Sequence, residues 1–77
     1  MARYVVQRFH NAQRLGRLIE VEAVSEHMAA EAIVGESLID GNLAGRLAAE
    51  VFLLEVPAAK RLFSRPSLRP QSARQSL

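Results

Sequence analysis

The sequence predicts a small α+β domain of β-β-α-β order, in which one helix packs on one face of a three-stranded antiparallel sheet. Two runs near the N-terminus have the residue types or the alternation of strands, and an alanine-rich run with helical spacing follows them. A compact apolar run then precedes Pro57. The 77 residues leave room for one domain with a thin core. We assign residues 1–57 to this domain and residues 58–77 to a basic tail, largely disordered.

The first predicted strand is Arg3–Phe9, a short segment of β-branched and aromatic residues. Tyr4 and Val6 would lie on one face of this strand. Val5 and Phe9 would lie on the other face, so the alternation does not decide which face is buried.

The second predicted strand, Arg17–Val24, follows a polar hairpin connection that ends in Gly16. Its inward positions are apolar: Ile19, Val21 and Ala23. Glu20 and Glu22 occupy the other face, where arginines of the first strand would pair with them. The pattern is that of a half-buried antiparallel strand.

The predicted helix, Glu26–Glu36, begins after Ser25, whose hydroxyl is suited to accept from a free N–H group of the first turn. Its expected packing face is made of small and branched residues: Ala29, Ala32 and Ile33. Glycines interrupt the pattern after the helix, so we expect a loop over residues 37–45.

The segment Leu47–Val56 has two readings. With helical spacing it continues a stripe, and the chain would be β-β-α-α; the stripe is Leu43, Leu47, Val51 and Leu54. With period two it is a mostly apolar strand. We predict a strand, because the run of valine, phenylalanine and leucine is compact and Pro57 would end it.

The composition changes after Pro57. We expect Ala58–Phe63 to form one helical turn and the residues after Ser64 to be disordered in the free protein. Residues 1–55 carry five arginines and eight acidic residues, a net charge of −3. Residues 56–77 carry five cations and no acid, a net charge of +5. The cations of the tail are Lys60, Arg61, Arg65, Arg69 and Arg74.

The residue types argue against several kinds of chemistry. The chain has no cysteine, so a disulfide framework and a thiol nucleophile are excluded. His27, Glu31 and Glu26 make an incomplete set of metal ligands. Neither a nucleophile elbow nor a phosphate-binding glycine motif is present. We therefore expect a non-enzymatic protein without catalytic residues, cofactor or metal.

We expect a cytoplasmic protein that interacts through its sheet, because the sequence shows neither a membrane span nor an export signal. One helix cannot cover both faces of a sheet, which leaves an apolar surface for a second copy or a larger protein. The candidate contact residues are Tyr4, Val6, Phe9, Phe52 and Leu54. The alternative function is nucleic-acid binding by the cations of the tail.

Overall fold

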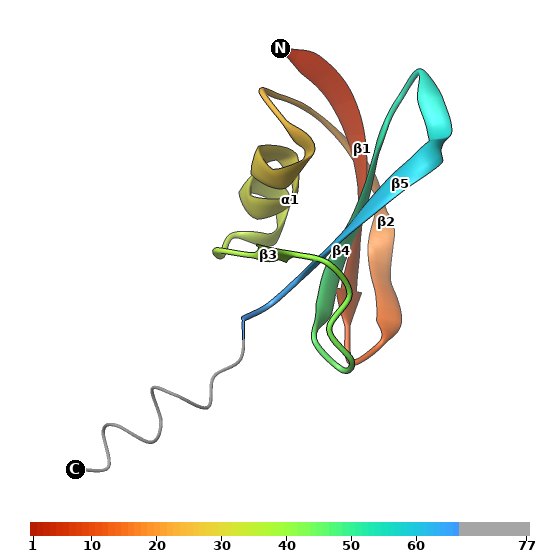
Figure 1. Ribbon diagram of the computed structural model, residues 1–77. Coiled ribbons are helices and arrows are strands. Elements are labelled where there is room, and N and C mark those ends of the chain that lie inside the picture. Colours follow the sequence, from red (N-terminus) through yellow and green to blue (C-terminus); the bar gives the residue numbers. More distant parts are fainter. Residues whose placement is uncertain (67–77) are drawn as a thin grey trace, which may run out of the picture.

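The computed structural model describes residues 1–66 and contains one helix and a five-stranded antiparallel sheet (Figure 1). The elements are β1 (Ala2–His10), β2 (Gln13–Ala23), α1 (Glu26–Val34), β3 (Ile39–Asp40), β4 (Leu47–Leu53) and β5 (Val56–Ser64). Their order across the sheet is β2-β1-β4-β5-β3. The α+β class is confirmed, and the sheet has five strands in place of the three expected.

A two-residue turn joins β1 and β2, a much shorter connection than the sequence predicted. Asn11 and Ala12 both have positive φ, of 52° and 66°, which is the backbone of a tight hairpin turn. The expected loop residues beyond them belong to β2, which begins at Gln13. The strand is therefore longer at its N-terminal end than its alternating pattern indicated.

A bulge interrupts β2 at Gly16. Val6 lies opposite Ile19 and Arg8 lies opposite Leu15, so three residues of β2 face the single residue Gln7. Gly16 has φ +74°, a conformation that glycine adopts without strain. Gly16, which we interpreted as the end of a loop, thus lies in a bulge within β2.

The helix α1 begins as predicted and ends two residues earlier. The Ser25 hydroxyl accepts from the Met28 N–H at 3.2 Å, and Gly35 closes the helix with φ 87°. Ala29 and Ile33 of the predicted packing face lie against the sheet, whereas Ala32 is exposed and Ala30 is buried in its place. The actual face is Ala29, Ala30, Ile33 and Val34.

The strand reading of Leu47–Val56 is confirmed for Leu47–Leu53, and the helical alternative is wrong. β4 lies between β1 and β5, with Val6 opposite Val51 and Tyr4 opposite Leu53. A strand with neighbours on both sides is packed closely, and Ala49 and Val51 are fully buried. The apolar composition of the segment follows from this central place.

The prediction for Ala58–Phe63 is wrong, because these residues lie in β5 and form no helical turn. Pro57 does not end the sheet either. Val56 pairs with Leu53 and Arg61 pairs with Val51, so Pro57 lies in an irregular stretch of the ladder, where its missing N–H is tolerated. Residues 58–64 of the expected tail are thus part of the sheet. The disorder expected after Ser64 falls mainly on residues 67–77, which lie outside the described residues.

The expected loop over residues 37–45 contains the short strand β3, which pairs with the end of β5. The buried Ser64 fixes this loop with both hydrogen-bonding functions of its hydroxyl. It donates to the Gly41 carbonyl at 2.7 Å and accepts from the Leu43 N–H at 2.9 Å. The C-terminal strand therefore holds the segment that joins α1 to β4.

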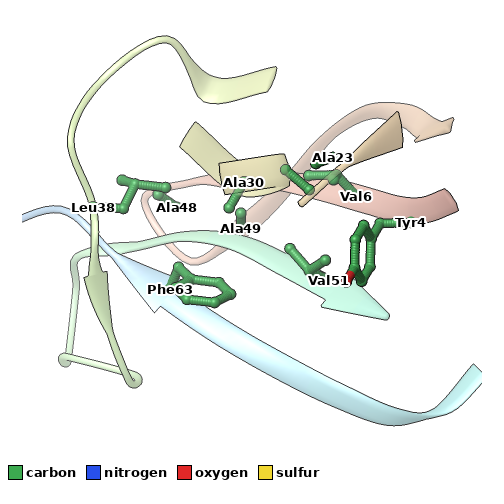
Figure 2. Packing of buried hydrophobic residues seen from close by; sticks show 10 residues of the cluster. Tyr4, Val6, Ala23, Ala30, Leu38, Ala48, Ala49, Val51 and Phe63 are labelled. Atoms are coloured by element: carbon green, nitrogen blue, oxygen red, sulfur yellow. The ribbon is translucent and has the colours of Figure 1, made fainter. Parts of the chain in front are cut away.

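The core lies between α1 and one face of the sheet (Figure 2). Its buried members are Tyr4, Val6, Ala23, Ala29, Ala30, Leu38, Ala48, Ala49, Val51 and Phe63. Half of them are alanines, and Phe63 is the largest of the fully buried side chains. Small residues let the helix approach the sheet closely, but they bury little apolar surface. The helix has nine residues, and no helix within residues 1–66 is long and apolar enough to cross a membrane.

Candidate interaction surface

No element of residues 1–66 covers the face of the sheet opposite α1 (Figure 1). Side chains alternate along a strand. Tyr4 and Val6 of β1 face the core, so Val5, Gln7 and Phe9 point to this second face. The register places Val5 between Glu20 of β2 and Phe52 of β4. We call this side the open face; its members are Arg3, Val5, Gln7, Phe9, Glu20, Glu22, Glu50, Phe52, Lys60 and Leu62.

Apolar side chains occupy the centre of the open face. Val5 is 4% exposed and lies between Glu20 and Phe52 of the neighbouring strands. Phe52 and Leu62, from β4 and β5, are partly exposed beside it. Phe9 is also partly exposed and lies toward the hairpin end of β1. A strip of aromatic and aliphatic side chains on a solvent-facing sheet is typical of a contact surface.

Charged side chains border this apolar centre on two sides. On the β2 side, Arg3 lies 3.3 Å from Glu22 and 3.8 Å from Glu20. On the β5 side, Lys60 lies 4.0 Å from Glu50, and its ammonium is 5.8 Å from the centre of the Phe52 ring. These pairs are largely exposed and contribute little stability, roughly 0–1 kcal/mol each. They give the border both signs of charge.

Gln7 is the one buried polar side chain of the open face, at 6% exposed. Its Nε2 donates to the Arg8 carbonyl at 3.2 Å and to the Gly16 carbonyl at 3.3 Å. The side chain thus binds backbone carbonyls on both strands beside the bulge in β2. Gln7 stabilises the shape of the surface and has little area to offer a partner.

The five predicted contact residues do not lie on one surface. Tyr4 and Val6 are 6% and 0% exposed and face α1, so they belong to the core and not to the open face. Phe9 and Phe52 lie on the open face. Leu54 is 42% exposed and follows β4 at the turn to β5. Two of the five predicted residues, Phe9 and Phe52, therefore share one surface.

Leu54 lines a cleft at the end of the sheet where the chain begins. The cleft has a volume of about 520 Å³. Its lining residues are Met1, Ala2, Arg3, Glu22, Leu53, Leu54 and Glu55. Arg3 and Glu22 contribute both to this cleft and to the border of the open face. The cleft extends the candidate surface toward the N-terminus.

The predicted cations of the tail that the structure describes are held by the domain. The ion pairs are Lys60–Glu50, Arg61–Asp40, Arg61–Glu26 and Arg65–Glu36. The guanidinium of Arg61 also lies 5.6 Å from the centre of the Phe63 ring. Arg69 and Arg74 lie outside the described residues. Carboxylates of the domain therefore neutralise most of the positive charge of residues 60–65.

His27 and Glu31 form a polar cluster with Leu38 at the side of α1. The His27 Nε2 lies 2.7 Å from the Leu38 carbonyl and 3.0 Å from the Glu31 carboxylate; both are acceptors, so Nε2 carries the proton. Glu31 accepts from the Leu38 N–H at 2.8 Å. The imidazole stacks on Phe63 with ring centres 5.2 Å apart. Residues 1–66 contain no group of three metal-ligating side chains.

Sequence reasoning missed Leu62 and Gln7 as members of this surface. Leu62 was expected within a helical turn, whereas β5 directs it to the face opposite Phe63. The available signal was the position of Leu62 beside the more hydrophobic Phe63, which in a strand separates the two onto different faces. For Gln7, no local pattern indicates burial.

No protein-family model, no curated protein and no solved structure matches this chain. The candidate surface is therefore interpreted from its own residues.

Proposed function

We propose that this protein is a non-enzymatic interaction module that binds another protein through the open face. The observation that carries the proposal is the partly exposed apolar pair of Phe52 and Leu62, which lies beside the buried Val5 on the uncovered side of the sheet. Its border is polar and partly ion-paired, which is the arrangement of many protein interfaces. An aromatic residue at the centre of such a patch supplies much of the binding energy.

A second copy of the chain is the partner that we infer first. The border of the open face carries both signs of charge, with Arg3 and Lys60 as cations and Glu20, Glu22 and Glu50 as anions. A surface with both signs around an apolar centre is able to face itself across a two-fold axis. The alanine-rich core also supports association, because a small domain with little buried surface gains stability from a partner.

The non-enzymatic part of the proposal rests on how the reactive side chains are used. The imidazole of His27 and the carboxylate of Glu31 both hold the backbone of Leu38. Their hydrogen bonds fix the segment after α1. These bonds give His27 and Glu31 a structural role, so acid–base chemistry is not needed to explain why the two side chains lie together.

Sedimentation velocity with the full-length protein and two variants tests the proposal. We expect the wild type to sediment at twice the chain mass at about 100 µM, and Phe52→Glu to sediment as a monomer, because a carboxylate at the centre of the patch would be buried without a partner. Met28→Glu, on the exposed side of α1 at 54% exposure, is the matched control and should remain dimeric.

A monomeric wild type would exclude the second copy as partner. Cross-linking in the source cell then decides whether the open face binds a different protein. Capture that is lost with Phe52→Glu and kept with Met28→Glu supports the open face. Capture that is equal in both variants contradicts it. Circular dichroism of each variant confirms that the fold is intact.

A further inference from the structure

The cations that lack a carboxylate partner gather at one end of the molecule. Within residues 1–66, Arg8, Arg14, Arg17 and Arg46 form no ion pair. Every other lysine or arginine of these residues lies within 4.0 Å of an acidic side chain; they are Arg3, Lys60, Arg61 and Arg65. The unpaired charge is therefore distributed unevenly.

The strand register places Arg8 and Arg14 near the end of the sheet that carries the β1–β2 turn, and Arg17 lies in the bulge opposite Gln7. Arg14 lies opposite Phe9, and Arg8 lies opposite Leu15. Arg46 directly precedes β4, whose Ala49 pairs with Arg8. We call Arg8, Arg14, Arg17, Arg46 and Arg65 the arginine end.

Arg65 belongs to the same end of the sheet. Its Nη1 donates to the Phe9 carbonyl at 3.3 Å, and its backbone N–H donates to the Arg46 carbonyl at 2.9 Å. Arg46 in turn donates from Nε to the Arg65 carbonyl at 3.2 Å and from Nη2 to the Pro66 carbonyl at 2.8 Å. Neutral carbonyl groups thus orient Arg46 without cancelling its charge.

The arginine end carries a concentrated positive charge. Within residues 1–66, Glu36 is the one carboxylate that pairs with a guanidinium group of the arginine end, and its partner is Arg65. The formal charge of the five arginines and Glu36 together is +4. The sequence did not show this concentration, because the five arginines are distributed between positions 8 and 65 and acidic residues lie between them.

The spread of the arginines favours an extended anion over a compact one. They come from β2, β1, the residue before β4 and the residue after β5, and adjacent strands are about 4.8 Å apart, so the set spans on the order of 15 Å. A single phosphate would need several groups that converge on one point. The cleft described above lies at the opposite end of the sheet. A run of phosphates matches charges that are distributed around one end of the sheet.

We propose that the arginine end binds the sugar-phosphate backbone of a nucleic acid, without reading its bases. Arg14 and Arg17 are exposed on the outer strand β2 and make the first contacts. Within the described residues this site shares Arg65 with the basic tail that the sequence suggested, whereas Lys60 and Arg61 are neutralised by carboxylates of the domain. The site adjoins the open face at Arg14, which lies opposite Phe9 in the strand register.

Fluorescence anisotropy with labelled 20-nucleotide single strands and duplexes, at several salt concentrations, tests this inference. The protein is used at full length, as wild type and with Arg14→Gln and Arg17→Gln together. We expect wild-type binding that weakens steeply with salt. We expect the double variant to lower the slope of log K against log salt by about 2, one for each lost phosphate contact.

The matched control is Arg61→Gln, compared with Arg14→Gln alone, because it removes one cation from a paired, exposed position outside both this end and the open face. Its binding should stay close to that of the wild type. Equal loss in Arg14→Gln and Arg61→Gln, or no binding at 50 mM salt, overturns the proposal. Binding to phosphatidylserine vesicles without binding to either nucleic acid also overturns it. Sedimentation of the Arg14 and Arg17 variant shows whether self-association is unchanged.

Discussion

Arg65 donates a hydrogen bond from Nη1 to the backbone carbonyl of Phe9, 3.3 Å away and 56 residues earlier in the chain. The same guanidinium donates from Nε to Glu36 at 3.1 Å. One side chain thus connects the residue after β5 to the end of β1 and to the segment after α1. The basic segment near the C-terminus is part of the framework of the domain up to this point.

Removal of β5 should therefore abolish the fold. A chain that ends at Val56 loses the partner of β4 and the fully buried Phe63, and we expect no cooperative thermal transition by circular dichroism. A chain that ends at Pro66 retains all described elements and should melt close to the full-length protein. Cooperative melting of the shorter chain at the full-length midpoint would contradict the structural role of β5.

The two phenylalanines of β4 and β5 should differ in their contribution to stability. Phe63 is fully buried and stacks on His27, so Phe63→Ala should lower the free energy of unfolding by about 3–5 kcal/mol. Phe52 is only partly buried on the open face, and Phe52→Ala should cost clearly less in the monomer. Urea denaturation of dilute protein measures both values. Equal losses would place Phe52 in a core that the structure does not show.

Glu31 should be important for the segment after α1. Glu31→Ala leaves the N–H of the buried Leu38 without an acceptor, and such a group costs about 1–3 kcal/mol. Glu31→Gln keeps one oxygen as acceptor and should cost less. Chemical denaturation of the two variants gives the comparison, and faster amide exchange at Leu38 in the alanine variant reports the local opening. A larger loss with glutamine than with alanine would rule out this role.

The sequence predicted the elements whose signals are local. Ile19, Val21 and Ala23 alternate with acidic residues, and this pattern led to β2 and to its buried face. The hydroxyl of Ser25 caps α1 as its position indicated. These features depend on residues within a few positions of one another, so they can be read from a short window of the chain.

Other features depend on which strands become neighbours. Ala58–Phe63 has no alternation typical of a strand, and it is extended because β4 offers it a pairing edge. The same holds for the choice between the two faces of β1, since the position of α1 buries Tyr4 and Val6 and leaves Phe9 on the other side. Tertiary contacts overrode weak local preferences in both cases.

The sequence by itself determined an α+β domain with a capped helix, and it indicated a surplus of cations near the C-terminus. The tertiary structure alone decided which charges remain unpaired. Strand pairing and loop closure bring Arg61 close to Asp40 and Arg65 close to Glu36. Arg14 and Arg17 have no such partner within the described residues. The physical reason is that Coulomb attraction acts over a few ångströms in space, whereas sequence order records only distance along the chain.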